Sequence, residues 1–310
     1  METYAVGIDI GGTNFRIGTV DGNGKLYDFQ KYSSVGLQGE DGLRELAKTI
    51  KTYRSSGKEA AKSKAVAIGV PATVSKDKRV VYSASYFKGF SGKDMKGYLE
   101  GKLGCPVYLD RDANFLLLND MENYGNEGCF SDMEMVAGLY YGTAVANAFY
   151  TRGAFYDGCH GAAGEISHNP LYGITDRCQC GKRGCMAVRN GGRYLQKLAK
   201  EQFGGCSMED IFEKHGQEPC IRRFVEDMAI PIVQIANILD PDLIFLGGGV
   251  TNIKSFPWET LNRAVRENTR GPVPAENLNM VHTVHTSASG VLGAGLYAVG
   301  QLEKKRGERK

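Results

Sequence analysis

The sequence predicts an α/β fold built from two similar halves. Two observations carry this prediction: strand-like and helix-like segments alternate along the chain, and one group of segments occurs twice. Segments 65–72 and 242–250 have the apolar and small residues of buried strands, whereas 42–56 and 220–240 have apolar residues at helical spacing. The chain of 310 residues is also longer than one hydrophobic core usually supports, which favours two lobes.

The repeated segment is a glycine hairpin. Residues 5–20 alternate apolar and small side chains around Gly11, Gly12 and Thr13, a pattern typical of a β-hairpin. Residues 135–150 repeat the pattern, with Gly142 and Thr143 at the turn. Aligning the two turns brings Val6 onto Val136, and each hairpin is followed by one of the buried-strand runs. We therefore expect two tandem α/β units with a cleft between them, one hairpin facing the other across it.

Composition excludes several classes of protein. The formal net charge of +3 is too small to indicate a nucleic-acid partner or an anionic membrane. No apolar run approaches the length of a membrane span, and the N-terminal METYAVGIDI lacks the basic region of a signal peptide. We expect a cytoplasmic protein with free thiols, in which most of the scattered cysteines are small buried apolar residues: Cys105, Cys129, Cys159, Cys206 and Cys220.

The first hairpin has the residues of a phosphate site. Asp9 ends the first strand, where a carboxylate orients Mg²⁺ through its water ligands. Gly11 and Gly12 leave backbone N–H groups unobstructed for phosphate oxygens, and the Thr13 hydroxyl adds a further hydrogen bond. A plain tight turn is the alternative. The glycines of 246–250 have a similar ambiguity, because they suit either the approach of a nucleotide or close packing of a helix on a strand.

A third apolar strand ends in LDRDANFLL (109–117), with Asp112 and Asn114 next to a helix start. A carboxylate in this place accepts the proton of a hydroxyl that attacks a γ-phosphate, and Asn114 fixes the surrounding loop. The alternative is that Asp112 caps the helix, which is a frequent role for aspartate.

Three clustered cysteines predict a metal site. Cys178, Cys180 and Cys185 lie on a glycine-punctuated loop that follows Glu165 and His168. With His168 they make a Cys₃His set, and four nitrogen and sulfur ligands are typical of structural Zn²⁺. Free thiols on a loop are the alternative. A redox motif is excluded because the inner spacing is CxC.

These motifs together resemble the ROK family (repressor, open reading frame, kinase) over nearly the whole chain. The resemblance rests on DIGGTNFR, LDRDAN, GEISH, CQCGKRGC, DPDLIFLGGGV and GVLGAGLYA. It implies an actin/hexokinase-like (ribonuclease H-like) fold and an ATP-dependent sugar kinase that uses Mg-ATP. It further implies a small N-terminal lobe over 1–115, which a C-terminal helix at about 291–310 completes, and a larger lobe over 116–290 with the zinc loop.

The resemblance assigns roles to individual residues. Asp112 corresponds to the catalytic base, and Arg111, Glu165 and His168 correspond to sugar contacts, with one His168 nitrogen for the metal and one for the sugar. The ATP and magnesium site corresponds to two phosphate loops and an adenosine loop: Asp9, Gly11, Gly12, Thr13, Gly142, Thr143, Gly248 and Gly249.

Within the family the chain is most similar to the D-allose kinases. Segment 70–79 (VPATVSKDKR) and Arg111 before Asp112 carry this similarity, and 256–261 (FPWETL) adds to it. The implied reaction is phosphorylation of D-allose on its 6-hydroxyl. Some positions depart from the family pattern: the second phosphate loop is GTAVA, in which the methyl groups of Ala144 and Ala146 impede close approach of a phosphate, and Ala187 and Tyr86 replace two usual polar sugar contacts.

Three other functions fit parts of the pattern. One is a kinase for another hexose or an N-acetylhexosamine, and another is a sugar-binding regulator with weakened catalysis. A ROK repressor is disfavoured, because those proteins place a DNA-binding domain before the sugar-binding part and here the phosphate loop begins at Asp9. ROK kinases are usually dimers or tetramers, so we expect a homodimer or homotetramer.

Overall fold

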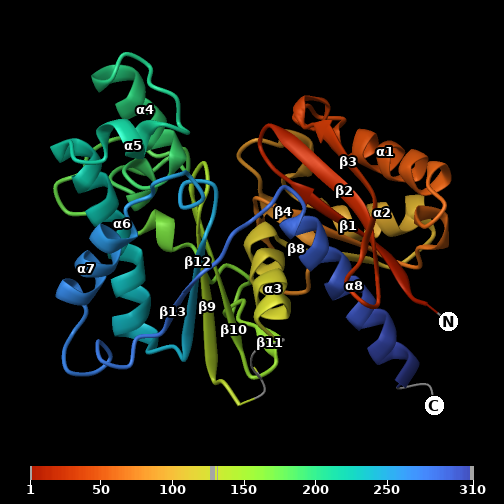
Figure 1. Ribbon diagram of the computed structural model, residues 1–310. Coiled ribbons are helices and arrows are strands. Elements are labelled where there is room, and N and C mark those ends of the chain that lie inside the picture. Colours follow the sequence, from red (N-terminus) through yellow and green to blue (C-terminus); the bar gives the residue numbers. More distant parts are fainter. Residues whose placement is uncertain (1, 126–129, 131, 308–310) are drawn as a thin grey trace. The chain divides into compact units, whose positions relative to one another are not determined.

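The computed structural model describes residues 2–125, 130 and 132–307 (Figure 1). The chain divides into two compact units: unit 1 contains Met1–Gly128, Asp157–Ala163 and Thr286–Lys310, and unit 2 contains Cys129–Tyr156 and Gly164–His285. The lobe boundary that we expected at residue 115 falls instead inside helix α3 (Asp112–Gly125). This helix packs closely on the C-terminal helix of unit 1, so all of its described residues belong to unit 1.

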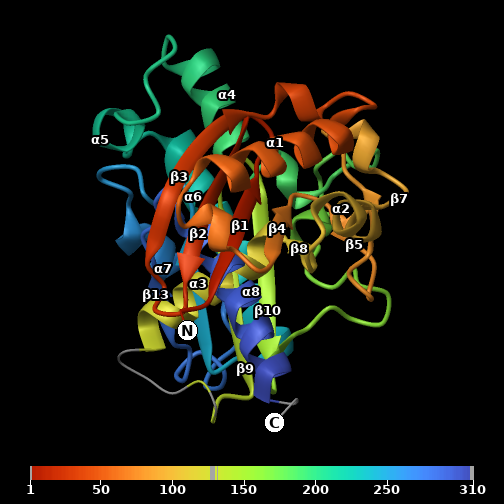
Figure 2. The ribbon, with the colours of Figure 1, turned by 90° about the vertical axis from the view of Figure 1, so that its right-hand side faces the viewer.

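Unit 1 is built on a five-stranded sheet in the order β3-β2-β1-β4-β8 (Figure 2). The strands are β1 (Tyr4–Ile10), β2 (Asn14–Asp21), β3 (Leu26–Ser33), β4 (Val66–Val70) and β8 (Val107–Arg111). Strands β1, β2 and β3 form antiparallel hairpins, whereas β4 and β8 run parallel to β1. A smaller three-stranded sheet contains β5 (Thr73–Val74), β6 (Val80–Ser83) and β7 (Lys93–Asp94).

The two faces of the large sheet bury different side chains because successive residues of a strand point to opposite faces. Val6, Ile8 and Ile10 pack with α1 (Gly42–Ser56) and α2 (Met95–Leu103). Ala5 and Ala67 pack on the other face with α3 and the C-terminal helix α8 (Ser289–Gly307). Small residues let α8 approach closely: a Cβ on Gly7 would overlap the carbonyl group of Val291, and a Cβ on Gly293 would overlap that of Phe115.

Unit 2 repeats this arrangement. Its sheet has the order β11-β10-β9-β12-β13, so that each unit has a hairpin followed by parallel strands. The strands are β9 (Met135–Tyr141), β10 (Val145–Thr151), β11 (Ala154–Phe155), β12 (Leu243–Gly247) and β13 (Met280–His282). Val6 pairs with Val66 in unit 1, and Val136 pairs with Leu243 in unit 2. The prediction of an α/β fold with two similar halves is therefore confirmed.

The helices of unit 2 cover one face of its sheet. Ala137, Leu139, Ile244 and Leu246 from the strands pack in one core with the buried sides of the helices. These helices are α4 (Gly192–Gln202), α5 (Ile211–His215), α6 (Pro219–Leu239) and α7 (Trp258–Asn268). The remaining helical turns are short 3₁₀ segments in both units: η1 (Val35–Leu37), η2 (Ala60–Lys62), η3 (Lys88–Phe90), η4 (Ile166–His168) and η5 (Met186–Val188).

The prediction that most scattered cysteines are buried is wrong. Cys159 is exposed, and Cys105, Cys206 and Cys220 are half-buried; Cys129 lies outside the described residues. Polar contacts explain two of these cases, because the guanidinium of Arg54 donates to Cys105 Sγ at 3.2 Å and Cys206 Sγ donates to the carbonyl oxygen of Ser207. Among the helices of the described residues, none has both the length and the apolar character to cross a membrane.

Candidate functional site

The tip of the first hairpin is held by the chain segment that follows β3. The hydroxyl of Ser34 donates to the carbonyl oxygen of Gly11 at 2.7 Å, and the backbone N–H of Ser34 donates to the carbonyl oxygen of Thr13 at 2.9 Å. Gln38 Nε2 donates to the carbonyl oxygen of Gly12 at 3.0 Å. All three carbonyl groups of the tip are therefore bonded within unit 1, which fixes the conformation of the predicted phosphate loop.

Asp9 lies at the end of β1, directly before this loop. It pairs in register with Arg16 on β2, and Arg16 Nη1 lies 3.2 Å from Asp9 Oδ2. Burial raises the pKa of Asp9 above its ordinary value, and the charge and hydrogen bond of Arg16 oppose this shift. The carboxylate also lies against Gly290 in the first turn of α8, where the helix dipole favours negative charge.

Asp112 stands where β8 ends and α3 begins. Its Oδ1 accepts a hydrogen bond from the N–H of Ala113 at 2.8 Å, within the first helical turn. The neighbouring strand β4 contributes Gly69, on which a Cβ would lie 3.1 Å from the Asp112 Cα. Gly69 pairs with both Asp9 and Asp110. The carboxyl ends of β1, β4 and β8 thus gather Asp9 and the start of α3 at one edge of the unit 1 sheet.

The residues on either side of Asp112 have structural partners. Asn114 Nδ2 donates to Asp110 Oδ1 at 2.8 Å, and both side chains are buried. Arg111 is only 9% exposed, and its Nη1 donates to the carbonyl oxygen of Ala163 at 2.6 Å. This contact ties Arg111 to the segment Asp157–Ala163 of unit 1, a contact that the sequence did not predict.

The second hairpin is held by the start of α4. The N–H of Gly192 donates to the carbonyl oxygen of Gly142 at 2.7 Å, and the N–H of Arg193 donates to that of Thr143 at 3.1 Å. The backbone of Ala144 and Ala146 lies outside the left-handed region, so their methyl groups cause no backbone strain. The GTAVA sequence is therefore compatible with the observed turn.

The two glycines after β12, Gly248 and Gly249, differ in what a side chain would meet at each position. Gly248 has a φ of 111°, and a Cβ there would lie 2.6 Å from the backbone of Tyr141, so this position requires glycine for its conformation and packing. A Cβ on Gly249 would have no heavy atom within 4 Å. Gly249 lines a hollow of about 440 Å³ with mostly charged and polar residues of unit 2, among them Glu209, Asn252 and Lys254. Close packing thus explains Gly248, whereas Gly249 is open to a ligand.

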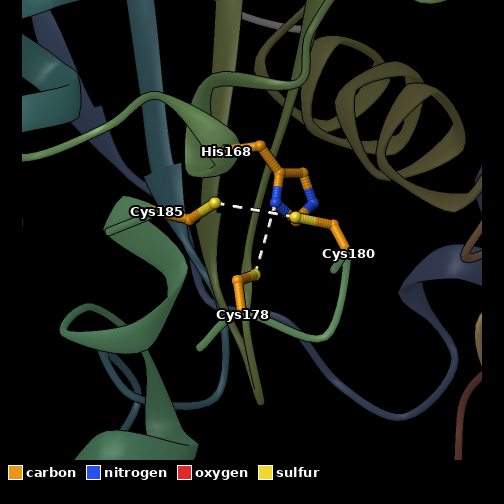
Figure 3. A group of neighbouring side chains, drawn as sticks. All are labelled: His168, Cys178, Cys180 and Cys185. Carbon is orange, nitrogen blue, oxygen red and sulfur yellow. Dashed lines mark hydrogen bonds between the residues drawn. The ribbon is translucent and has the colours of Figure 1, made fainter. Parts of the chain in front are cut away.

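The predicted metal ligands converge within unit 2. Their four ligand atoms all lie within 4.8 Å of one another. Figure 3 shows His168, Cys178, Cys180 and Cys185 pointing toward one centre. His168 Nδ1 lies 3.6 Å from Cys178 Sγ, and Cys180 Sγ lies 3.6 Å from Cys185 Sγ. A tetrahedral Zn²⁺ with Zn–S bonds of about 2.3 Å separates two sulfur ligands by about 3.8 Å, so the donor types and spacings fit such an ion.

Glu165 lies beside the other nitrogen of the same imidazole. Its Oε2 is 3.7 Å from His168 Nε2, and both side chains are 38% exposed. The preceding hairpin supports this turn, because Asn147 Oδ1 accepts from the N–H of Ile166 at 3.3 Å. His168 therefore presents Nδ1 to the thiols and Nε2 to Glu165.

The sequence profile described as "ROK family" matches residues 5–300. The chain belongs to the ROK family. It is 26% identical to the N-acetyl-D-glucosamine kinase of Citrobacter koseri over 93% of this chain and 97% of that kinase. It is 23% identical to the glucokinase of Thermotoga maritima over 84% of this chain and 86% of that enzyme. The structure is similar to the crystal structure of the ROK hexokinase from Thermus thermophilus, with a TM-score of 0.75 and 25% sequence identity. The match covers 98% of this chain and 100% of that hexokinase.

The family fold explains how the predicted residues are grouped. This ROK chain has the actin/hexokinase-like fold, with Asp9, the first loop, Arg111 and Asp112 in unit 1. The second loop, Gly248, Gly249, Glu165 and the Cys₃His cluster are in unit 2. Sequence reasoning missed Arg16, Gly69 and Gly290. Counting back across the predicted hairpin pairs Asp9 with Arg16, so that partner had a detectable signal.

Proposed function

We propose that this protein transfers the γ-phosphoryl group of Mg-ATP to the 6-hydroxyl of a hexose, with D-allose as the sugar. It is a ROK sugar kinase. The single observation that carries the proposal is a pair of aspartates at the carboxyl edge of the unit 1 sheet: Asp9 lies near the end of β1, and Asp112 directly follows β8. Phosphoryl transfer needs positioning, charge neutralisation and one base, and Asp9 and Asp112 supply two of these requirements.

Asp112 acts as the general base in this proposal. Its carboxylate accepts the proton of the sugar 6-hydroxyl as the oxygen attacks the γ-phosphorus, and the bond from that phosphorus to the ADP oxygen breaks. Asp9 would hold Mg²⁺ through bound water, and the amides of Gly11 and Gly12 would bind phosphate oxygens. Magnesium, when bound, neutralises charge on the phosphates. Gly142, Thr143, Gly248 and Gly249 hold the rest of the nucleotide.

The proposed sugar contacts are the side chains of Asp112, Glu165 and His168. Each forms hydrogen bonds with sugar hydroxyls, and His168 does so through Nε2. The Arg111 guanidinium is a planar fork of N–H donors, which discriminates between hydroxyl positions more sharply than the amide it replaces. Segment 70–79 and Arg111 support D-allose among the hexoses.

The Cys₃His cluster binds one structural Zn²⁺ in this proposal. Four protein ligands leave no open position for a substrate, so the ion orders the loop rather than taking part in the reaction. The ion would hold the His168 ring through Nδ1, which leaves Nε2 available to the sugar and to Glu165.

The proposal is tested by measuring kcat/KM with Mg-ATP for D-allose, glucose, mannose, fructose, N-acetylglucosamine and N-acetylmannosamine side by side. We expect D-allose to rank first, because polar sites that pair with a specific hydroxyl discriminate strongly against its misplacement. A higher kcat/KM for two or more other sugars would remove D-allose and leave the kinase. Native mass measurement in the same preparation tests the expected homodimer or homotetramer.

A second function has support from three positions. Ala144 and Ala146 in the second loop and Ala187 after the last zinc cysteine replace the usual family residues, which favours a sugar-binding regulator with weakened catalysis. The same panel separates the two functions. Calorimetric binding of a sugar without turnover of any sugar in the panel would favour the regulator.

A further inference from the structure

One lysine of unit 1 joins two carboxylates from distant parts of the sequence. Lys78 Nζ lies 2.8 Å from Asp110 Oδ1 and 2.5 Å from Asp157 Oδ1. The side chains of these residues are 21%, 3% and 19% exposed, respectively. Charges removed from water need a partner, so both aspartates depend on this one ammonium group. Burial raises the pKa of Asp110, and Lys78 opposes that shift.

The backbone of Lys78 shows that this placement is specific. Its φ is 57°, in the left-handed region where glycine or asparagine is the usual residue. The turn is fixed by its own hydrogen bonds: the N–H of Lys78 donates to the carbonyl oxygen of Ser75 at 2.8 Å, and the N–H of Val80 donates to Ser75 Oγ at 2.9 Å. A long side chain at a strained turn position is consistent with a role for the side chain itself.

Asp157 begins the segment Asp157–Ala163, which docks on unit 1 at three points. Lys78 binds its first residue. Gly161, with a φ of 82°, lies so close to the β5–β6 turn that a Cβ would be 2.5 Å from the carbonyl oxygen of Val74. Arg111 Nη1 binds the carbonyl oxygen of Ala163, the last residue of the segment. The chain passes directly from this segment to Gly164 and Glu165.

Asp110, the second carboxylate partner of Lys78, lies beside the turn that contains Asp112. Its Oδ1 also accepts from the N–H of Arg111 at 2.7 Å and from Asn114 Nδ2 at 2.8 Å. These two donors bracket Asp112, the first residue of α3. The carboxylate of Asp110 therefore fixes the turn that presents Asp112, and its charge is balanced by Lys78.

We propose that Lys78 is a positioning residue that sets sugar affinity by holding the turn around Asp112 and the segment before Glu165 together. This inference rests on the proposed function for its kinetic part. The two ion pairs of Lys78 are with Asp110, beside the turn of Asp112, and with Asp157, at the start of the segment before Glu165. Both partners lie outside the first hairpin, so loss of Lys78 should weaken use of the sugar and leave use of the nucleotide unchanged.

The test compares Lys78→Gln with Lys78→Arg, which retains the charge, and with Arg79→Gln. Arg79 is the matched control because it is the next residue and forms its ion pair with Asp94 at the surface. Two quantities are measured: deuterium exchange of peptides covering 157–165, and KM for the best sugar and for ATP. For Lys78→Gln we expect about tenfold faster exchange and about tenfold higher sugar KM, with ATP KM unchanged.

Lys78→Arg should keep both the exchange rate and the sugar KM close to their wild-type values, and Arg79→Gln should match the wild type. Wild-type exchange and sugar KM in a folded Lys78→Gln protein would overturn the proposal, as would an equal rise in both KM values. If Lys78→Gln does not fold, Asp157→Asn provides the same test, because it removes one contact and keeps the Lys78–Asp110 pair. If the wild type phosphorylates no sugar, the proposed function fails, while the exchange measurement still decides whether Lys78 holds the segment.

Discussion

The carboxylate of Asp9 occupies the space in which a side chain at position 290 would begin. A Cβ on Gly290 would lie 2.7 Å from Asp9 Cγ, closer than real Cβ contacts allow, and 3.0 Å from its Oδ1. The first strand of the protein and the first turn of its last helix therefore share one site, and the proposed magnesium-orienting carboxylate depends on a glycine about 280 residues away in the sequence.

Gly290→Ala should displace the Asp9 carboxylate. Because misplacement by about 1 Å costs up to about 10²-fold in rate, we expect kcat/KM for Mg-ATP to fall by about 10–10²-fold with sugar affinity retained. The matched control is Gly300→Ala in the same helix, where a Cβ meets no heavy atom within 4 Å. Steady-state kinetics of both variants test this expectation. An unchanged kcat/KM for Mg-ATP in Gly290→Ala would show that the position of Asp9 does not matter to nucleotide use.

Asp112→Asn should reduce turnover while leaving sugar binding nearly intact. The amide is nearly isosteric but accepts no proton at neutral pH, and loss of a general base typically costs about 10²–10⁴-fold. Calorimetry gives the sugar affinity and an ADP-release assay gives kcat. Glu122→Gln is the control, since Glu122 is an exposed carboxylate on the same helix. Near wild-type turnover would reduce Asp112 to a residue that only starts the helix.

Cys180→Ser should release the metal and lower both thermal stability and sugar affinity. The motivation is the set of four ligand atoms within 4.8 Å, of which this change removes one. Elemental analysis of the wild type should find one zinc per chain. Cys159→Ser, at an exposed cysteine outside the cluster, should keep the metal and the melting temperature. An active, well-folded wild-type preparation without zinc would contradict the metal assignment.

Asp21→Asn should destabilise unit 1 in a pH-dependent way. Although burial opposes it, hydrogen bonds from the N–H groups of Lys25 and Asn23 and from the Tyr27 hydroxyl lower the pKa of Asp21. A lowered folded-state pKa contributes stability above the unfolded value, about 3.9, that is lost as pH falls through the folded value.

Urea unfolding should therefore show a loss of about 1–3 kcal/mol for Asp21→Asn at pH 7, and a smaller loss near pH 3. The exposed Asp41, changed to Asn, serves as the control. A deficit for Asp21→Asn that stays constant from pH 7 to pH 3 would rule out the charge as its cause.

Local patterns in the sequence were sufficient to predict the duplicated fold and the convergence of His168, Cys178, Cys180 and Cys185. The hairpin turns at Gly12 and Gly142 occupy equivalent places in the two sheets, because alternation and turn residues fix a hairpin within one short segment. The cysteines at 178, 180 and 185 come together for the same reason, since they share one loop with close turns.

Contacts between segments that are distant in the sequence could not be predicted, because no local pattern in the sequence indicates them. Nothing near Gly290 indicates that it faces Asp9, and nothing near Lys78 indicates two carboxylate partners from positions 110 and 157. Arg111 is instructive: the residue type was noticed, but its contact with Ala163 arises from the docking of a segment about 50 residues later. The expected lobe boundary at residue 115 also differs from the observed division, because α3 packs on α8 and therefore belongs to unit 1.

The packing of α8 on β1 also bears on the order in which the protein is made. The five strands of the unit 1 sheet are synthesised by residue 111, and α3 follows directly, yet the second helix that covers Ala5 and Ala67 begins only at Ser289. This face of the sheet therefore remains only partly covered while all of unit 2 is synthesised. We therefore expect a nascent chain stalled before α8 to depend on chaperones that bind exposed apolar strands.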